Sequence, residues 1–251
     1  MLQLLILMHL FGDFIIQNDK DVLRRKERPF WGNIVHILKT EILYVIIGLI
    51  FMMITKKDLS ELLNLIIAIL ILIVSHFLID LFKGFTTYYK NIIPLIKEAD
   101  DDKFNFKTFI IDQLLHITAI YLIFSFLDLD TITFNSELHN FLVLINAVLI
   151  STMVGHYFIV GVLSCLCKRY SKNNKNFETA KFIGIIERIL IISFMILGSF
   201  EFIAIVMGLK VFSNFLDEDS KITDRNSFII GNLLSIMLAG VGYLYYISLV
   251  I

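Results

Sequence analysis

Long apolar runs limit how this chain can fold more than any other feature of its sequence. A helix needs about 18–20 apolar residues to cross the hydrocarbon core of a bilayer, and several runs here, such as residues 62–85, approach or exceed that length. The 251 residues are 57% hydrophobic, with a mean hydropathy of +0.80. A soluble domain would instead leave a polar face on each helix for water. The sequence therefore predicts an all-α polytopic membrane protein, a bundle of transmembrane helices.

The apolar runs divide into about eight membrane segments within a single integral membrane domain, residues 1–251. Residues 181–215 are too long for one upright span, and Gly198-Ser199 is a natural break within them. The sixth and seventh segments are therefore expected to form a tight helical hairpin. The predicted segments are 1–17, 31–55, 62–85, 106–128, 138–166, 180–199, 201–217 and 227–251.

Basic residues indicate the orientation of the chain, because loops rich in lysine and arginine stay on the cytoplasmic side of a membrane. The second loop has only Lys56 and Lys57, and the fourth and sixth loops have none. We therefore expect cytoplasmic odd-numbered loops, with both termini outside the cell membrane. The net charge of −1 gives no indication of a nucleic-acid partner. The odd-numbered loops carry Lys20, Arg24, Arg25, Lys26, Arg28, Lys90, Lys97, Lys103, Lys168, Arg169, Lys172, Lys175, Lys221 and Arg225.

Three predicted spans each carry a histidine and an aspartate four residues apart, a spacing that places both on one helix face. The histidine comes first on the two spans that descend toward the cytoplasm and second on the span that rises from it. In all three the carboxylate therefore lies nearer the cytoplasm, and the histidine lies about one turn deeper. This order predicts one polar cluster at a common depth. The pairs are His9 with Asp13, His76 with Asp80, and Asp112 with His116.

The cost of burying these groups indicates that they face the interior of the bundle. A single aspartate at the centre of a span costs ~2.5–3.5 kcal/mol on insertion scales. His36, on the second span, lies close to the same depth, and Lys39 and Lys83 are the only fixed cations expected nearby. A divalent metal ion would neutralise several carboxylates at once and is bound well by neutral imidazole. Alternatively, the pairs are structural contacts between helices, each contributing ~0.6 kcal/mol.

Several of these motifs together resemble an uncharacterised family of bacterial multi-pass integral membrane proteins, a domain of unknown function. They are "HLFGDFIIQNDK", His36, the H-x3-D-x2-K motif from His76 to Lys83, and "DQLLH" at 112–116. The later segments "GIIERILI" and "GLKVFSNF" also look like the C-terminal part of that family, so the resemblance spans most of the chain. It implies a multi-span fold and a polar cluster without naming a reaction. More loosely, the chain is similar to bacterial membrane-bound metal-dependent hydrolases.

The first functional hypothesis is a metal-dependent hydrolase that acts at the inner leaflet on a lipid or lipid-linked substrate. A bound zinc, manganese or iron ion would polarise a phosphoryl or acyl oxygen. His36 would serve as a further ligand or as a base, and Lys83 would stabilise developing negative charge. Gln17 and Gln113 would orient the ligands from a second shell. The expected metal ligands are His9, Asp13, His76, Asp80, Asp112 and His116.

Two other hypotheses use the same residues. In a proton- or cation-coupled transporter, the carboxylates and histidines would carry protons or bind a cation. Such a protein needs a polar pathway across the whole bilayer, and the outer halves of the spans show no matching polar series. In a non-catalytic structural or signalling subunit, the pairs would only hold helices together, and the charged cytoplasmic loops would contact a partner.

Overall fold

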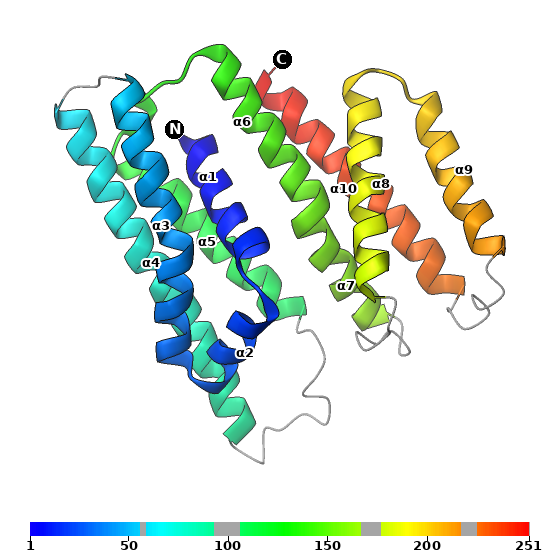
Figure 1. Cartoon of the computed structure of the whole chain (residues 1–251), viewed down its shortest axis with the longest axis horizontal. Helices are drawn as coiled ribbons and strands as arrows, with labels where there is room; N and C mark the ends of the chain where they lie inside the picture. The colour runs from blue at the N-terminus through cyan, green and yellow to red at the C-terminus, as the bar shows by residue number, and fades with distance from the viewer. Residues whose placement is uncertain (56–58, 93–105, 167–176, 217–224, 251) are drawn as a thin grey trace. The chain divides into compact units, whose positions relative to one another are not determined.

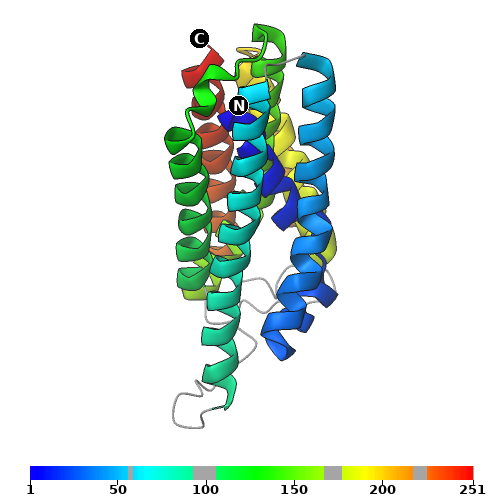
Figure 2. The ribbon, with the colours of Figure 1, turned by 90° about the vertical axis from the view of Figure 1, so that its left-hand side faces the viewer.

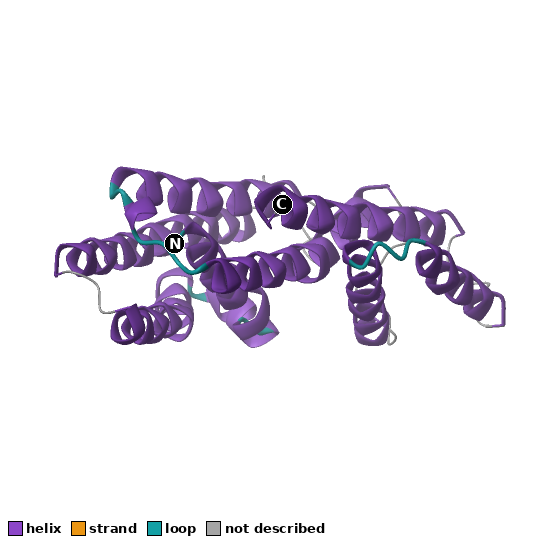
Figure 3. Cartoon of the chain, turned by 90° about the horizontal axis from the view of Figure 1, so that it is seen from above, coloured by secondary structure: helices purple, strands orange, loops and turns teal. Residues whose placement is uncertain are grey.

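The computed structural model describes residues 1–55, 59–92, 106–166, 177–216 and 225–250, and the described residues are almost entirely helical (Figures 1 and 3). This confirms the predicted all-α class. The chain divides into two compact units, Met1–Leu142 (unit 1) and Val143–Ile251 (unit 2). The single integral membrane domain stays a prediction.

Unit 1 is a bundle in which the first helix packs against longer helices from later in the sequence. The short helix α1 contacts α3 and α5, and α4 contacts both α3 and α5. The elements are α1 (Leu2–Phe11), its π-helical continuation η1 (Gly12–Ile16), α2 (Asp19–Glu27), α3 (Pro29–Thr55), α4 (Leu59–Ile92), α5 (Phe106–Phe126), η2 (Leu129–Thr131) and the start of α6 (Ser136–Leu149).

The short polar helix α2 folds back against the end of the bundle where α3 begins (Figures 1 and 2). Its N-terminus is closed by a capping box, in which Asn18 accepts a hydrogen bond from the Asp21 backbone amide and the Asp21 carboxylate accepts one from that of Asn18. Pro29 then begins α3, at the helix position where its missing amide proton costs least. A Cβ on Gly32 would lie 2.7 Å from the Cα of Arg25, so glycine permits this close approach of α2 and α3.

An apolar core joins the helices of unit 1 on one side of the polar cluster. On each of α1, α3, α4 and α5, a buried core residue lies within about one helical turn of a buried polar residue of the cluster. The neighbouring residues are Met8 and His9, Tyr44 and Glu41, Leu72 and His76, and Ile120 and His116. The buried core consists of Met1, Leu4, Leu5, Met8, Tyr44, Leu65, Ala68, Ile69, Leu72, Ile120, Leu129, Ile132 and Leu142.

Unit 2 contains the predicted helical hairpin. Helix α8 ends at Ile196 and α9 begins at Glu201, and Gly198 between them has a φ of +69°, a conformation that favours glycine. Lys210 of α9 donates a hydrogen bond to the carboxylate of Glu187 of α8 and so joins the two arms of the hairpin. The elements are the rest of α6, η3 (Ile150–Val154), α7 (Gly155–Leu166), α8 (Phe177–Ile196), α9 (Glu201–Leu216) and α10 (Arg225–Val250).

Five described helical segments are long and apolar enough to cross a membrane, as expected of a membrane protein. The predicted count of eight spans is not confirmed, because three predicted segments do not meet that description. The first is the shorter apolar helix Leu2–Ile16. Helix α9 has only 16 residues, and α8 carries charged residues along its length. The five are Pro29–Gly48, Ser60–Phe85, Phe106–Phe126, Ser136–Leu166 and Asn226–Val250.

The predicted orientation stays a prediction, since no membrane accompanies the structure. Most of the loops on which it depends lie outside the described residues. These are 56–58, 93–105, 167–176 and 217–224, which contain Lys56, Lys57, Lys97, Lys103, Lys168, Arg169, Lys172, Lys175 and Lys221.

Candidate metal centre

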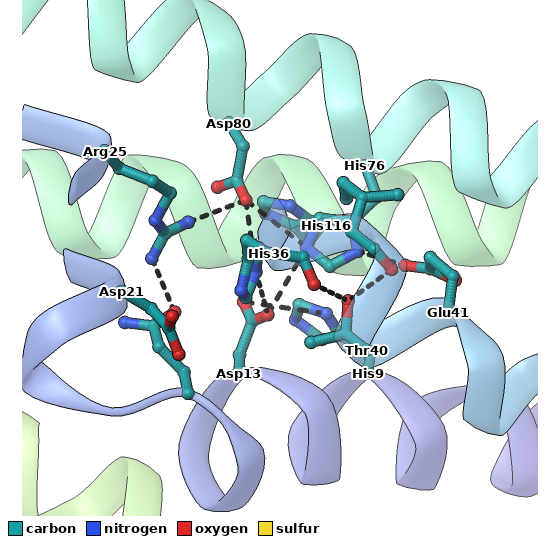
Figure 4. A network of polar contacts seen from close by, with 12 residues as sticks. His9, Asp13, Asp21, Arg25, His36, Thr40, Glu41, His76, Asp80 and His116 are labelled. Carbon is teal, nitrogen blue, oxygen red and sulfur yellow. Dashed lines mark hydrogen bonds and ion pairs between the residues drawn. The ribbon is translucent and has the colours of Figure 1, made fainter. Parts of the chain in front are cut away.

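Four histidines from four helices of unit 1 meet in a buried cluster (Figure 4). His9 and His116 are stacked, with ring centroids 4.8 Å apart and ring planes 14° from parallel. The ring of His76 stands edge-on to both of them and to that of His36. All four side chains are at most 6% exposed. The predicted faces therefore meet in one place within unit 1.

Asp13 is the carboxylate on which three of these imidazoles converge. Its Oδ1 lies 3.3 Å from Nε2 of His76 and 3.4 Å from Nε2 of His36. Its Oδ2 lies 3.9 Å from Nδ1 of His9. Asp13 belongs to the π-helical turn η1, which is closed by a hydrogen bond from the backbone amide of Gln17 to the carbonyl of Gly12.

Asp80 approaches the same imidazoles from α4. Its Oδ2 lies 3.4 Å from Nε2 of His36 and 3.6 Å from Nε2 of His76. The same oxygen accepts a hydrogen bond of 2.7 Å from Nη1 of Arg25. Asp80 therefore faces an arginine on one side and two histidines on the other (Figure 4).

Two of the histidines are oriented through their Nδ1 atoms. Nδ1 of His76 lies 2.7 Å from Oε1 of Glu41, and Nδ1 of His116 lies 2.8 Å from the backbone carbonyl oxygen of Asp112. With Nδ1 donating to an acceptor of this kind, Nε2 keeps a free lone pair, as in histidines that bind metals. Among the described atoms, Nε2 of all four histidines and Oδ1 of Asp13 have no hydrogen-bond partner.

These donors form two groups in which three ligand atoms lie close enough together to hold one metal ion. The first group is His9, Asp13 and His76, and the second is His36, His76 and Asp80. In each group the ligand atoms lie within 4.8 Å of one another. Imidazole nitrogens with carboxylate oxygens suit zinc, manganese and iron, so the residues fit the divalent ion that the sequence predicts. His76 belongs to both groups.

Asp112 and His116, the remaining predicted ligands, belong to neither group. Oδ2 of Asp112 accepts hydrogen bonds from Lys83 at 2.6 Å and from Gln113 at 3.2 Å. His116 stacks on His9 inside the cluster. Gln17 lies beyond Arg25, from whose Nη2 it accepts a hydrogen bond. Lys83 and Gln113 thus contact Asp112, and Gln17 reaches Asp80 only through Arg25.

Two residues of the site, Arg25 and Glu41, were not among the predicted site residues. The expectation that Lys39 and Lys83 are the only fixed cations nearby was wrong, because Arg25 contacts Asp80 directly and Lys39 pairs with Asp21. Lys83 does contact a predicted ligand, Asp112. Arg25 looked like one of the ordinary basic residues of a cytoplasmic loop. The capping signal N-x-x-D at Asn18–Asp21 marks the start of the helix that carries it.

The ion pair between Asp21 and Lys39 fastens α2 to α3. Nζ of Lys39 lies 2.7 Å from Oδ1 of Asp21, and the guanidinium of Arg24 lies 3.7 Å from the same oxygen. Burial raises the pKa of Asp21, but hydrogen bonds from Lys39 and the Asn18 backbone, together with the charges of Lys39 and Arg24, outweigh it and hold the pKa below its ordinary value. This ion pair keeps the helix that carries Arg25 beside the cluster.

The fold and the cluster together define a class: all-helical proteins that have helices long and apolar enough to span a membrane and a buried histidine–carboxylate centre. Residues 1–145 match the family described as "Protein of unknown function (DUF3307)", and the chain belongs to this family. Membership of an uncharacterised family is therefore confirmed. The match contains every residue of the candidate centre. Unit 1 ends at Leu142, and the match ends three residues later. The C-terminal segments that resemble the same family lie outside the match. No curated protein and no solved structure matches the chain.

Proposed function

We propose that this protein binds a divalent metal ion at the cluster and hydrolyses a lipid or lipid-linked substrate at the cytoplasmic leaflet of the cell membrane. One observation carries the proposal: four buried imidazole Nε2 atoms have no hydrogen-bond partner among the described atoms, and three of these four histidines belong to groups that also contain a carboxylate. A buried polar atom without a partner costs about 1–3 kcal/mol. A metal ion would satisfy several such atoms at once.

This cost favours a metal-binding role over a purely structural one. Residues that only joined helices would be expected to hydrogen-bond to one another, as Glu41 does with His76. Nε2 of His36 instead lies 3.4 Å from both Asp13 and Asp80, which is long for a hydrogen bond to either. Such spacing around a shared point suits an ion held between the side chains.

The packing of unit 1 also favours a hydrolase over a transporter. On the side of the cluster away from α2, the helices meet in a largely hydrophobic core, beside which Gln3 is also buried. Leu5, Met8 and Ala68 in this core are at most 1% exposed. A transported ion would have to cross this packed apolar layer, whereas a hydrolase needs access from one side only.

The chain's own residues would perform distinct tasks in hydrolysis. A bound divalent ion supplies a Lewis acid that polarises a phosphoryl or acyl oxygen and lowers the pKa of a water to ~7. With an ion held by His9, Asp13 and His76, His36 between Asp13 and Asp80 would be placed to accept a proton from the attacking water; with an ion in the second group it would instead be a ligand. Lys83, now paired with Asp112, would stabilise the negative charge that develops on the substrate.

A surface pocket between α2 and the start of α3, separate from the cluster, has a lining whose chemistry suits a lipid. It has a volume of about 340 Å³ and combines three cations with apolar side chains. Trp31, at its edge, is 64% exposed, as is common for residues at a membrane interface. A pocket of this kind suits an anionic headgroup with its acyl chains beside it. It is lined by Lys20, Leu23, Arg24, Glu27, Arg28, Trp31 and Val35.

Metal quantification of the detergent-purified full chain tests the proposal. The wild-type protein is expected to retain zinc, manganese or iron, and His76→Ala is expected to lose it because His76 belongs to both groups. Asp80→Ala is expected to lose part of it. His139→Ala is the matched control, since His139 lies on α6, which contributes no residue to the cluster. Failure of the wild type to hold or take up any of these metals, or an unchanged content in His76→Ala, would contradict the proposal.

A further inference from the structure

Arg25 and the second candidate metal group compete for the same carboxylate. Nη1 of Arg25 donates to Oδ2 of Asp80 at 2.7 Å, and this oxygen is also the one that faces Nε2 of His36 and of His76. Arg25 reaches it from α2, outside the four helices that supply the histidines. In the structure, the guanidinium therefore supplies positive charge to a carboxylate that a metal ion would also use.

A metal ion among His36, His76 and Asp80 would weaken the hold of Asp80 on Arg25. Metal–oxygen bonds of this kind are ~2.0–2.2 Å long, so the ion would draw electron density from the oxygen that now accepts the arginine proton. The two cations would also repel each other at this short separation. Metal binding should thus free Nη1 of Arg25 while the Asp21–Lys39 ion pair keeps α2 in place.

A freed guanidinium beside a bound metal is well suited to a phosphoryl group. Its planar donors match two phosphate oxygens at once. Its side chain is 14% exposed, so it lies between the buried cluster and solvent. Gln17, which accepts from Nη2, keeps the plane of the guanidinium oriented.

We propose that Arg25 binds the phosphoryl group of the substrate, and that the divalent ion enables this by taking Asp80 away from it. This inference rests on the proposed function and narrows its substrate to a phosphate ester. The shared chemistry is a phosphate group, which free inorganic phosphate and an anionic lipid headgroup both offer.

The test compares wild type, Arg25→Ala and Arg25→Lys in two titrations of the purified full chain. In the first, Mn²⁺ or Zn²⁺ is titrated into metal-free protein. Arg25→Ala is expected to bind the metal about tenfold more tightly than wild type, because the competing cation is gone. Lys26→Ala is the control, since Lys26 is an exposed cation on the same helix.

In the second titration, inorganic phosphate or short-chain phosphatidic acid is added to the metal-loaded protein. The wild type is expected to bind at least one of them, and Arg25→Ala is expected to bind it at least tenfold more weakly. Arg25→Lys keeps the charge without the planar donors and should bind phosphate more weakly than wild type while its metal affinity stays unchanged. The probe that binds identifies the source of the phosphate.

The outcomes separate this inference from the one on which it rests. If all variants bind metal and Arg25→Ala keeps the wild-type affinity for both phosphate probes, the role of Arg25 is overturned and the metal centre stands. If the metal-loaded wild type binds neither probe, the role of Arg25 is likewise overturned. If no variant binds metal, both proposals fail together.

Discussion

Glu41 holds His76 from the side of the ring opposite the candidate metal centre. Oε1 of Glu41 lies 2.7 Å from Nδ1 of His76, and Nε2 of the same ring lies 3.3 Å from Oδ1 of Asp13. Carboxylates placed this way fix the orientation of a metal-binding imidazole and make it a stronger ligand. The contact joins α3 to α4 within the cluster.

Replacing Glu41 with glutamine is therefore expected to weaken metal binding without removing a ligand. The affinity should fall by ~10–100-fold, the usual cost of losing an outer-shell partner. Competition with a chelator of known affinity measures it. Glu137→Gln on α6 makes the same chemical change outside the cluster and should bind metal as the wild type does. Equal affinities for the two variants would show that Glu41 does not orient His76 for metal.

Replacing each of the three histidines in the two groups should lower the bound metal content by a different amount. His9 belongs only to the first group, His36 only to the second, and His76 to both. We expect His9→Ala and His36→Ala each to retain part of the bound metal and His76→Ala to retain none. The metal-to-protein ratio of the purified variants measures this. Complete loss in His9→Ala would argue against two groups with a common ligand.

Gly32→Ala is expected to push α2 away from α3. The added Cβ would lie 2.7 Å from the Cα of Arg25 and 2.8 Å from the carbonyl carbon of Arg24, and backbone atoms cannot move aside as a flexible side chain can. The free energy of unfolding should fall by ~1–3 kcal/mol, and trypsin should cleave the basic α2 segment faster.

Gly208→Ala is the control for that variant. A Cβ there meets nothing within 4 Å, so the change should leave α2 intact and raise stability by up to ~1 kcal/mol through better helix propensity. If Gly32→Ala behaves as Gly208→Ala does, the close approach of α2 and α3 is not required.

The attachment of α2 should depend on pH through Asp21. Its pKa is below the ordinary value of 3.8, so its bond to Lys39 stabilises the fold above about pH 4 and loses this effect as the pH falls through the lower, folded-state pKa. At pH 7, the backbone amides of α2 should exchange faster in Asp21→Asn than in wild type, once the intrinsic exchange rates are corrected for. In metal-free wild type, α2 should show the same faster exchange only below about pH 4. An α2 that exchanges equally in both proteins at pH 7 would contradict this role for Asp21.

In unit 2, Lys210→Ala would leave the carboxylate of Glu187 buried without its partner. Glu187 is 4% exposed and Lys210 is 25% exposed, so the loss should approach the ~3 kcal/mol typical of breaking a buried pair from one side. Denaturant unfolding in detergent measures it. The double change Glu187→Gln with Lys210→Met should recover much of the stability. A single variant as stable as wild type would show that the pair contributes little.

The sequence was informative about the cluster because helical periodicity relates spacing to direction. A four-residue interval placed each histidine and aspartate on one face, and the inverted order on α5 placed the pairs at one depth. Asp112 nevertheless pairs with Lys83 and Gln113. Periodicity defines the face of a helix, but it does not define which neighbour on the next helix a side chain will reach.

Arg25 could not be found in this way, because its role arises from the return of α2 against the bundle. In the sequence it stands among the basic residues near the end of a span, where the positive-inside pattern explains every one of them equally well. The contact with Asp80 bridges 55 positions. The packing of α2 against α3 is what brings Arg25 to Asp80.

The π-helical turn η1 makes the number of residues between His9 and Gln17 matter as much as their identity. One residue turns an α-helix by about 100°, and η1 closes from Gln17 to Gly12, one residue further than an α-helical bond. Deleting Gly12 would let the turn relax into an ordinary α-helix, and the segments on either side would keep nearly the same faces, because the wider π turn takes up one extra residue. Asp13 would then follow His9 by three residues instead of four, which turns its side chain by about 100° relative to that histidine. A deletion here should therefore be more damaging than many substitutions, even though every histidine and carboxylate outside the turn would remain.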